Sequence, residues 1–189
     1  MKLPNRILGI VAMLASPFLL AELSITREQG NTSRSGIYDL IYMTGWMCTI
    51  VGLLRIEATG KSRKNKIVLY VQLVLLTIAN IWNSWTIINP GNRSIVYFIL
   101  DFFWPLSNLC LLIIGIIVMV KAVLRGWKRY IVLVAGLWLP FMILTMLVLG
   151  KQWVTTVSGI YSMLSWFIMG YMIFTFTPVT RYGEVRKNE

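Results

Sequence analysis

The polar residues with the clearest chemical potential lie inside one apolar segment, residues 94–120. Tyr97, Asp101, Pro105 and Asn108 follow one another at intervals of three or four residues, and Trp104 lies beside them. On an α-helix of 3.6 residues per turn, this spacing predicts one continuous polar stripe. Pro105 has no backbone N–H, so it frees a carbonyl one turn earlier, near the carboxylate of Asp101. A carboxylate beside a free carbonyl is typical of ion and substrate sites in membrane helices.

Other apolar segments carry polar side chains at helical spacing as well. Asp39 begins a stripe in residues 37–56, and Asn80 and Asn83 share a broad face in residues 67–88. Together with the first stripe, these side chains predict one ligand- or ion-binding site, formed by Asp101, Asp39, Asn80, Asn83, Asn108, Tyr97 and Trp104. A third stripe, near the C-terminus, consists of Ser158, Ser162 and Ser165.

Asp101 is the centre of the expected site, because an ionisable side chain within a membrane span is costly and often functional. No Lys or Arg lies in the interior of an apolar segment to neutralise it. Its carboxyl group must therefore hold a proton, bind a cation or accept hydrogen bonds from Asn, Ser and Tyr neighbours. The last outcome is a structural alternative, in which the carboxyl group only holds helices together. For Asp39 and Glu22, which lie nearer to helix ends, a solvated carboxylate is the simpler interpretation.

The absent residue types exclude several kinds of catalysis. The chain has no histidine, which excludes a Ser-His-Asp or Cys-His nucleophile system and any His-ligated haem, zinc or iron. Cys48 and Cys110 are far apart in apolar runs and show no metal-ligand spacing. No nucleophile-elbow sequence and no glycine-rich phosphate loop occurs. We therefore expect no enzyme activity, no cofactor and no bound metal.

The composition indicates that the apolar segments lie in lipid. Of the 189 residues, 57% are hydrophobic and 13% are charged, whereas soluble domains have about 45–50% apolar and about 25% charged residues. A membrane helix needs about 20 mostly apolar residues. Six segments qualify, and they predict one all-α domain over residues 1–189, an integral membrane bundle of six transmembrane helices at about 7–25, 37–56, 67–88, 94–120, 130–149 and 153–176.

The basic residues predict the orientation of this bundle. With the N-terminus inside, the inner segments hold fourteen Lys and Arg and the outer segments hold four. This positive-inside bias predicts that both termini are cytoplasmic, in a plasma or bacterial inner membrane. It also accounts for the formal net charge of +11 through contact with anionic lipid headgroups, so no nucleic acid partner is expected.

The stripes further predict which helices enclose the polar core. We expect the second, third, fourth and sixth segments to surround it, and the nearly apolar first and fifth segments to face lipid. The sequence favours a small transporter or binding protein with an outward-facing aromatic and acidic cavity for a proton, a sodium ion or a small organic cation. The alternative is a non-catalytic accessory subunit or sensor, with a membrane protein partner or as a homo-oligomer.

Overall fold

The computed structural model describes residues 4–91 and 94–176, and every regular element in these ranges is an α-helix. Five segments are long and apolar enough to cross a membrane, or six if the bent pair α6–α7 forms one span. The helices are α1 (Asn5–Ala15), α2 (Phe18–Gln29), α3 (Ser33–Arg55), α4 (Arg63–Ile88), α5 (Ile95–Lys121), α6 (Lys128–Gly136), α7 (Trp138–Leu149) and α8 (Lys151–Phe174).

Two of the expected spans are interrupted by proline. α1 ends just before Pro17, which has no N–H for the carbonyl of Met13; the Ser16 hydroxyl donates to that carbonyl instead, at 2.8 Å. α6 and α7 meet at an angle of 52°, and Pro140 follows the last residue of α6, Gly136, by four positions. A proline ring clashes with the carbonyl four residues earlier, which gives the physical reason for this bend. By contrast, α5 continues through Pro105.

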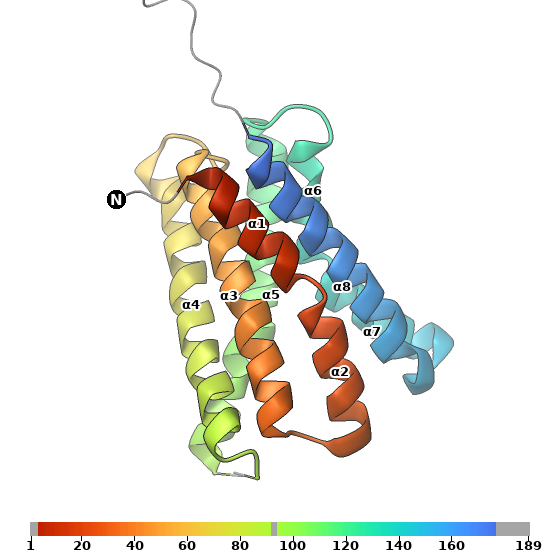
Figure 1. The fold of residues 1–189 in the computed structure, drawn as a ribbon. Helices are drawn as coiled ribbons and strands as arrows, with labels where there is room; N and C mark the ends of the chain where they lie inside the picture. Colours follow the sequence, from red (N-terminus) through yellow and green to blue (C-terminus); the bar gives the residue numbers. More distant parts are fainter. Residues whose placement is uncertain (1–3, 92–93, 177–189) are drawn as a thin grey trace, which may run out of the picture.

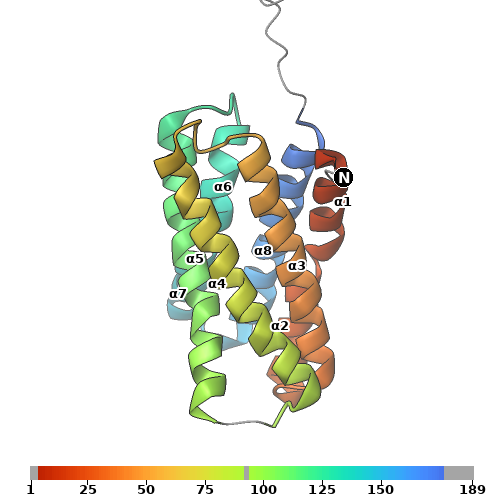
Figure 2. The same ribbon diagram turned by 90° about the vertical axis from the view of Figure 1, so that its left-hand side faces the viewer.

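The helices run side by side, and their ends gather at two opposite ends of the bundle (Figures 1 and 2). We call one of them the terminal end. It carries the start of α1, the end of α8 and the connections α3–α4 and α5–α6. We call the opposite end the far end. It carries the connections α2–α3, α4–α5 and α7–α8. Figure 1 shows α6 and α7 leading in succession from the terminal end to the far end, so the bent pair occupies the place of one span.

Apolar side chains fill most of the interior near the terminal end. Fully buried members of this core come from α3, α4, α5 and α8, and they include Ile50, Leu53, Leu69, Ile114, Val118 and Ile173. Many large apolar side chains on the outside of the bundle remain exposed, such as Leu14, Phe102 and Leu147. An apolar interior with an apolar exterior is the pattern of a helix bundle that lies in lipid.

α5 and α6 approach each other closely through two glycines. A Cβ atom on Gly115 would lie 2.5 Å from the Cα atom of Leu133, and one on Gly136 would lie 2.7 Å from the Cα atom of Leu112. Both obstructing atoms belong to backbone, which cannot move aside as a flexible side chain can. Small residues at such positions allow helix backbones to pack closely in membranes.

We expect Gly115→Ala to destabilise the bundle, because its new methyl group would push α6 away from α5. Overpacking of this kind costs about 1–3 kcal/mol, which exceeds the gain in helix propensity of about 1 kcal/mol. Thermal unfolding in a mild detergent measures the effect. Gly91→Ala is the matched control, because its Cβ atom would meet nothing within 4 Å. Equal Tm values for the two variants would contradict the close packing of α5 and α6.

Candidate ligand-binding cavity

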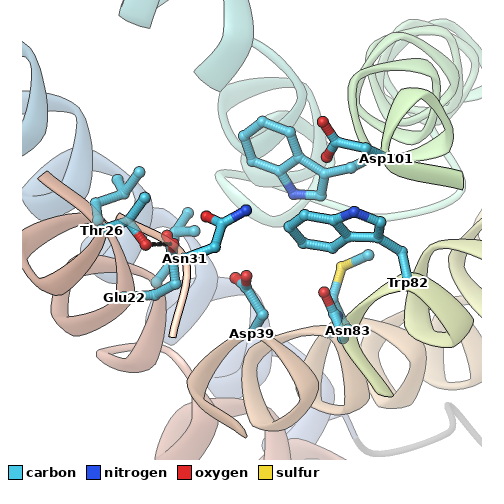
Figure 3. A pocket seen from close by; sticks show the side chains of 11 residues that line it. Glu22, Thr26, Asn31, Asp39, Trp82, Asn83 and Asp101 are labelled. Carbon is cyan, nitrogen blue, oxygen red and sulfur yellow. Dashed lines mark hydrogen bonds between the residues drawn. The ribbon is translucent and has the colours of Figure 1, made fainter. Parts of the chain in front are cut away.

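A cavity of about 220 Å³ lies in the far half of the bundle, where α2, α3, α4 and α5 face one another (Figure 3). The exposed Asn31, in the α2–α3 connection, lies at its rim. The lining combines carboxylates, amides, indoles and a few aliphatic side chains: Leu19, Glu22, Leu23, Thr26, Asn31, Asp39, Met43, Trp82, Asn83, Asp101 and Trp104.

Three carboxylates lie on three different walls of the cavity. Glu22 is seven residues before the end of α2, Asp39 is six residues after the start of α3, and Asp101 is six residues after the start of α5. At 1.5 Å per residue, all three lie about 9–10 Å from the helix ends at the far end. Local helical geometry therefore places them at one common depth.

The carboxylates differ in their hydrogen-bond partners. Thr26 Oγ1 donates to Glu22 Oε1 at 2.5 Å. Asp39 is only 9% exposed, and within the described ranges neither Asp39 nor Asp101 forms a hydrogen bond or an ion pair through its carboxylate. Figure 3 shows the Asp39 carboxylate pointing into the cavity. An unpaired buried carboxylate is costly, so it needs a proton or a cation from outside the protein.

One of the two basic side chains nearest in sequence to these acids, Arg27, is directed elsewhere. Arg27, on α2, donates from Nη1 to the backbone carbonyl of Gln152, at 3.0 Å, at the start of α8. No Lys or Arg appears in the lining of the cavity among the residues that the structure describes. The cavity therefore concentrates negative charge without a positive partner of its own.

Two indole rings form the aromatic part of the wall. Trp82 comes from α4, and Figure 3 shows its ring between Asp101 on one side and Asp39 and Asn83 on the other. Trp104 packs edge-on against Trp138, with ring centroids 5.2 Å apart. Trp138 is buried and donates from Nε1 to the carbonyl of Ser158 at 2.8 Å, which fixes the support behind Trp104. The indole faces can attract a cation through their π electrons.

Tyr97 ties the rim of the cavity to its wall. Asn31 Nδ2 donates to the Tyr97 hydroxyl oxygen at 3.1 Å, and the Thr86 hydroxyl lies 2.8 Å from the same oxygen. The Tyr97 ring also packs against Trp82, with centroids 5.3 Å apart. One buried phenol thus connects the α2–α3 connection, α4 and α5.

The structure brings four of the seven predicted site residues to the cavity: Asp101, Asp39, Asn83 and Trp104. Asn80 lies behind Asn83, whose Nδ2 donates to Asn80 Oδ1 at 3.0 Å. Asn108 is buried and donates to the carbonyl of Trp104 at 3.0 Å, one turn away on α5. Tyr97 acts at the rim rather than in the lining. That any of these residues binds a ligand stays a prediction.

Sequence reasoning missed one whole wall of the cavity. The prediction that the first segment, residues 7–25, faces lipid is wrong for its second half, because Leu19, Glu22 and Leu23 of α2 line the cavity. Thr26, just beyond that segment, lines it as well. The pair Glu22 and Thr26, four residues apart, carried a signal that could have indicated this face. The loop residue Asn31 and the ring of Trp82 had no comparable signal, because their places depend on how separate helices pack.

The sixth segment buries its serine stripe as expected, since Ser158, Ser162 and Ser165 are 0–3% exposed, but no residue of α8 lines the cavity. The hydroxyls of Ser158 and Ser165 donate to carbonyls of α8 itself, of Val154 and Ser162 respectively. Gly159 lies against Leu20 of α2, where a Cβ atom would come within 2.5 Å of the leucine side chain. This stripe of small residues therefore packs helices together.

Comparison with protein family models, with curated proteins and with solved structures finds no match for this chain. Within the described residues, no group of three or more Cys, Asp or Glu side chains is placed to hold one metal ion. The three carboxylates are instead spread over separate walls with aromatic surface between them.

We expect Tyr97→Phe to loosen the rim of the cavity, because Asn31 and Thr86 would both lose the hydroxyl that joins them. Losing a hydrogen bond of this kind costs about 0.5–1.5 kcal/mol. Hydrogen–deuterium exchange should then become faster in the backbone around residues 30–36. Tyr70→Phe is the control, because Tyr70 is 57% exposed and its side chain makes no hydrogen bond to a described residue. Unchanged exchange in Tyr97→Phe would show that the tether does not hold the rim.

Proposed function

We propose that this chain is a small multi-pass membrane transporter whose cavity takes up a small organic cation from the outer side. The observation that carries this proposal is the carboxylate of Asp39, which is 9% exposed, faces the cavity and has no partner within the described protein. A bound cation would supply the missing counter-charge. Asp101, on the opposite side of Trp82, is a second carboxylate that an ammonium group could pair with.

The aromatic wall favours an organic cation over a bare ion. A cation over the face of an indole gains about 0.5–2 kcal/mol, and the gain is larger when water is excluded. A proton or a sodium ion would satisfy a carboxylate but would leave the faces of Trp82 and Trp104 unused. An ammonium group attached to a hydrocarbon can use the carboxylates and the indoles together. In this proposal, a proton or sodium ion is a coupling ion at most.

The charges at the two ends of the bundle support an outward-facing cavity. Among the described residues, ten Lys and Arg lie at the terminal end: Arg6, Arg55, Lys61, Arg63, Lys64, Lys66, Lys121, Arg125, Lys128 and Arg129. The far end carries three, Arg27, Arg34 and Lys151. By the positive-inside rule, the terminal end would face the cytoplasm and the cavity would face outward, in a plasma or bacterial inner membrane.

Two interrupted spans beside the cavity support transport rather than binding alone. The break at Ser16 and Pro17 separates α2, which forms a wall of the cavity, from α1. The break between α6 and α7 adjoins Trp138, on which Trp104 packs. Discontinuous helices next to the substrate site are a recurrent feature of transporters, and residues at the ends of helices can act as hinges. The apolar core at the terminal end would then be the closed inner gate.

Thermal unfolding in a nonionic detergent tests the binding part of this proposal. Butylammonium chloride should raise the Tm of the wild type above the Tm in sodium chloride of equal ionic strength, because a ligand stabilises the state that it binds. Each kcal/mol of binding corresponds to roughly 2–4 °C for a chain of this size. The rise should be smaller in Asp39→Asn and in Asp101→Asn than in the wild type, because each variant keeps only one of the two unpartnered carboxylates.

Glu28→Gln is the matched control. It also removes one negative charge at the far end of the bundle, but Glu28 is exposed near the end of α2 and does not line the cavity. It should keep the full response to butylammonium. A rise in Tm that is equal in all four proteins would mean that the ion acts outside the cavity. No rise in the wild type would contradict cation binding and would favour carboxyl groups that only hold the helices together.

A further inference from the structure

The two unpartnered carboxylates of the cavity are separated by an aromatic ring. Asp39 belongs to α3 and Asp101 to α5, while α4 packs against both of these helices and contributes Trp82. Figure 3 shows the Trp82 ring between Asp101 and Asp39. A single ammonium group at one of these carboxylates would therefore leave the other without a counter-charge.

The third carboxylate is in a different position. Glu22 already accepts a hydrogen bond from Thr26 within its own helix. Asp39, by contrast, is nine-tenths buried, points into the cavity and has no partner among the described residues. Asp101 is half-buried and likewise has no hydrogen bond or ion pair there. Two of the three carboxylates in the cavity thus have no partner, and they lie on opposite sides of the Trp82 ring.

From this arrangement we infer that the ligand is a short linear organic dication with an ammonium group at each end, the chemistry of an alkane diamine. One ammonium group pairs with Asp39 and the other with Asp101, and the methylene chain lies along the Trp82 indole. The two positive charges of the ligand are then balanced by Asp39 and Asp101, while Glu22 keeps its hydrogen bond from Thr26. This inference rests on the proposed function and adds the charge and shape of the ligand to it.

The length of the diamine should control its affinity, because its two ammonium groups are joined by the methylene chain. When two binding groups are joined by a linker that matches the span between their sites, affinity exceeds that of either group by about 10²–10⁴-fold. A linker that is too short loses this gain, because only one end can bind at a time. A linker that is too long loses part of it. Affinity should therefore pass through a maximum as the diamine is lengthened.

Isothermal titration of the wild-type protein in a nonionic detergent tests the inference. The probes are ethane-, butane-, hexane- and octane-diammonium, each compared with the monoammonium ion of equal chain length at constant ionic strength and pH 7. We expect the best diammonium ion to bind at least about tenfold more tightly than its monoammonium counterpart. This comparison needs no variant, so it does not depend on how well a substituted protein folds.

Variants then locate the two ends of the ligand. Asp39→Asn and Asp101→Asn should each reduce diammonium affinity to the level of the monoammonium ion, and Glu28→Gln should leave it unchanged. Full diammonium affinity in both Asp variants would overturn the assignment of the two ends.

The failure of this inference is distinguishable from the failure of the proposed function. If monoammonium ions bind the wild type as tightly as every diammonium ion, the ligand is a monocation and the inference is wrong, while the proposed function stands. If neither class of ammonium ion binds, the proposed function fails together with the inference.

Discussion

The far half of this bundle is organised around a carboxylate that the protein buries without pairing it. Asp39 is 9% exposed and faces a cavity in which the described residues offer it no hydrogen bond and no cation. In a membrane, where water cannot easily screen a charge, such a group is costly. The fold surrounds it with two further carboxylates and two indoles, and this combination is suited to an ammonium ion.

The rest of the structure positions this site. Close glycine contacts fix α5 against α6, and Trp138 supports Trp104 from behind. Tyr97 holds the rim through Asn31 and Thr86. The apolar core fills the bundle between the cavity and the terminal end. α2, which follows the break at Pro17, forms one wall of the cavity.

The sequence predicted features that depend on a single helix. Hydropathy predicted the apolar spans because a helix in lipid must satisfy its own backbone, and helical spacing placed Asp101 and Trp104 on one wall. Neither hydropathy nor helical spacing could predict contacts between helices. The serines of α8 have the spacing of a lining face and are buried, yet no residue of α8 lines the cavity. The contribution of Glu22 likewise depends on how α2 packs beyond Pro17.

The most direct test of the central claim is to observe the cavity indoles by nuclear magnetic resonance during titration with butylammonium. The indole N–H signals of Trp82 and Trp104, assigned with Trp→Phe variants, should shift in a saturable manner. The signals of Trp127 and Trp153, which are 48% and 52% exposed outside the cavity, should not move. If Trp82 and Trp104 do not respond, or if all four indoles shift alike, the cation does not bind between these carboxylates.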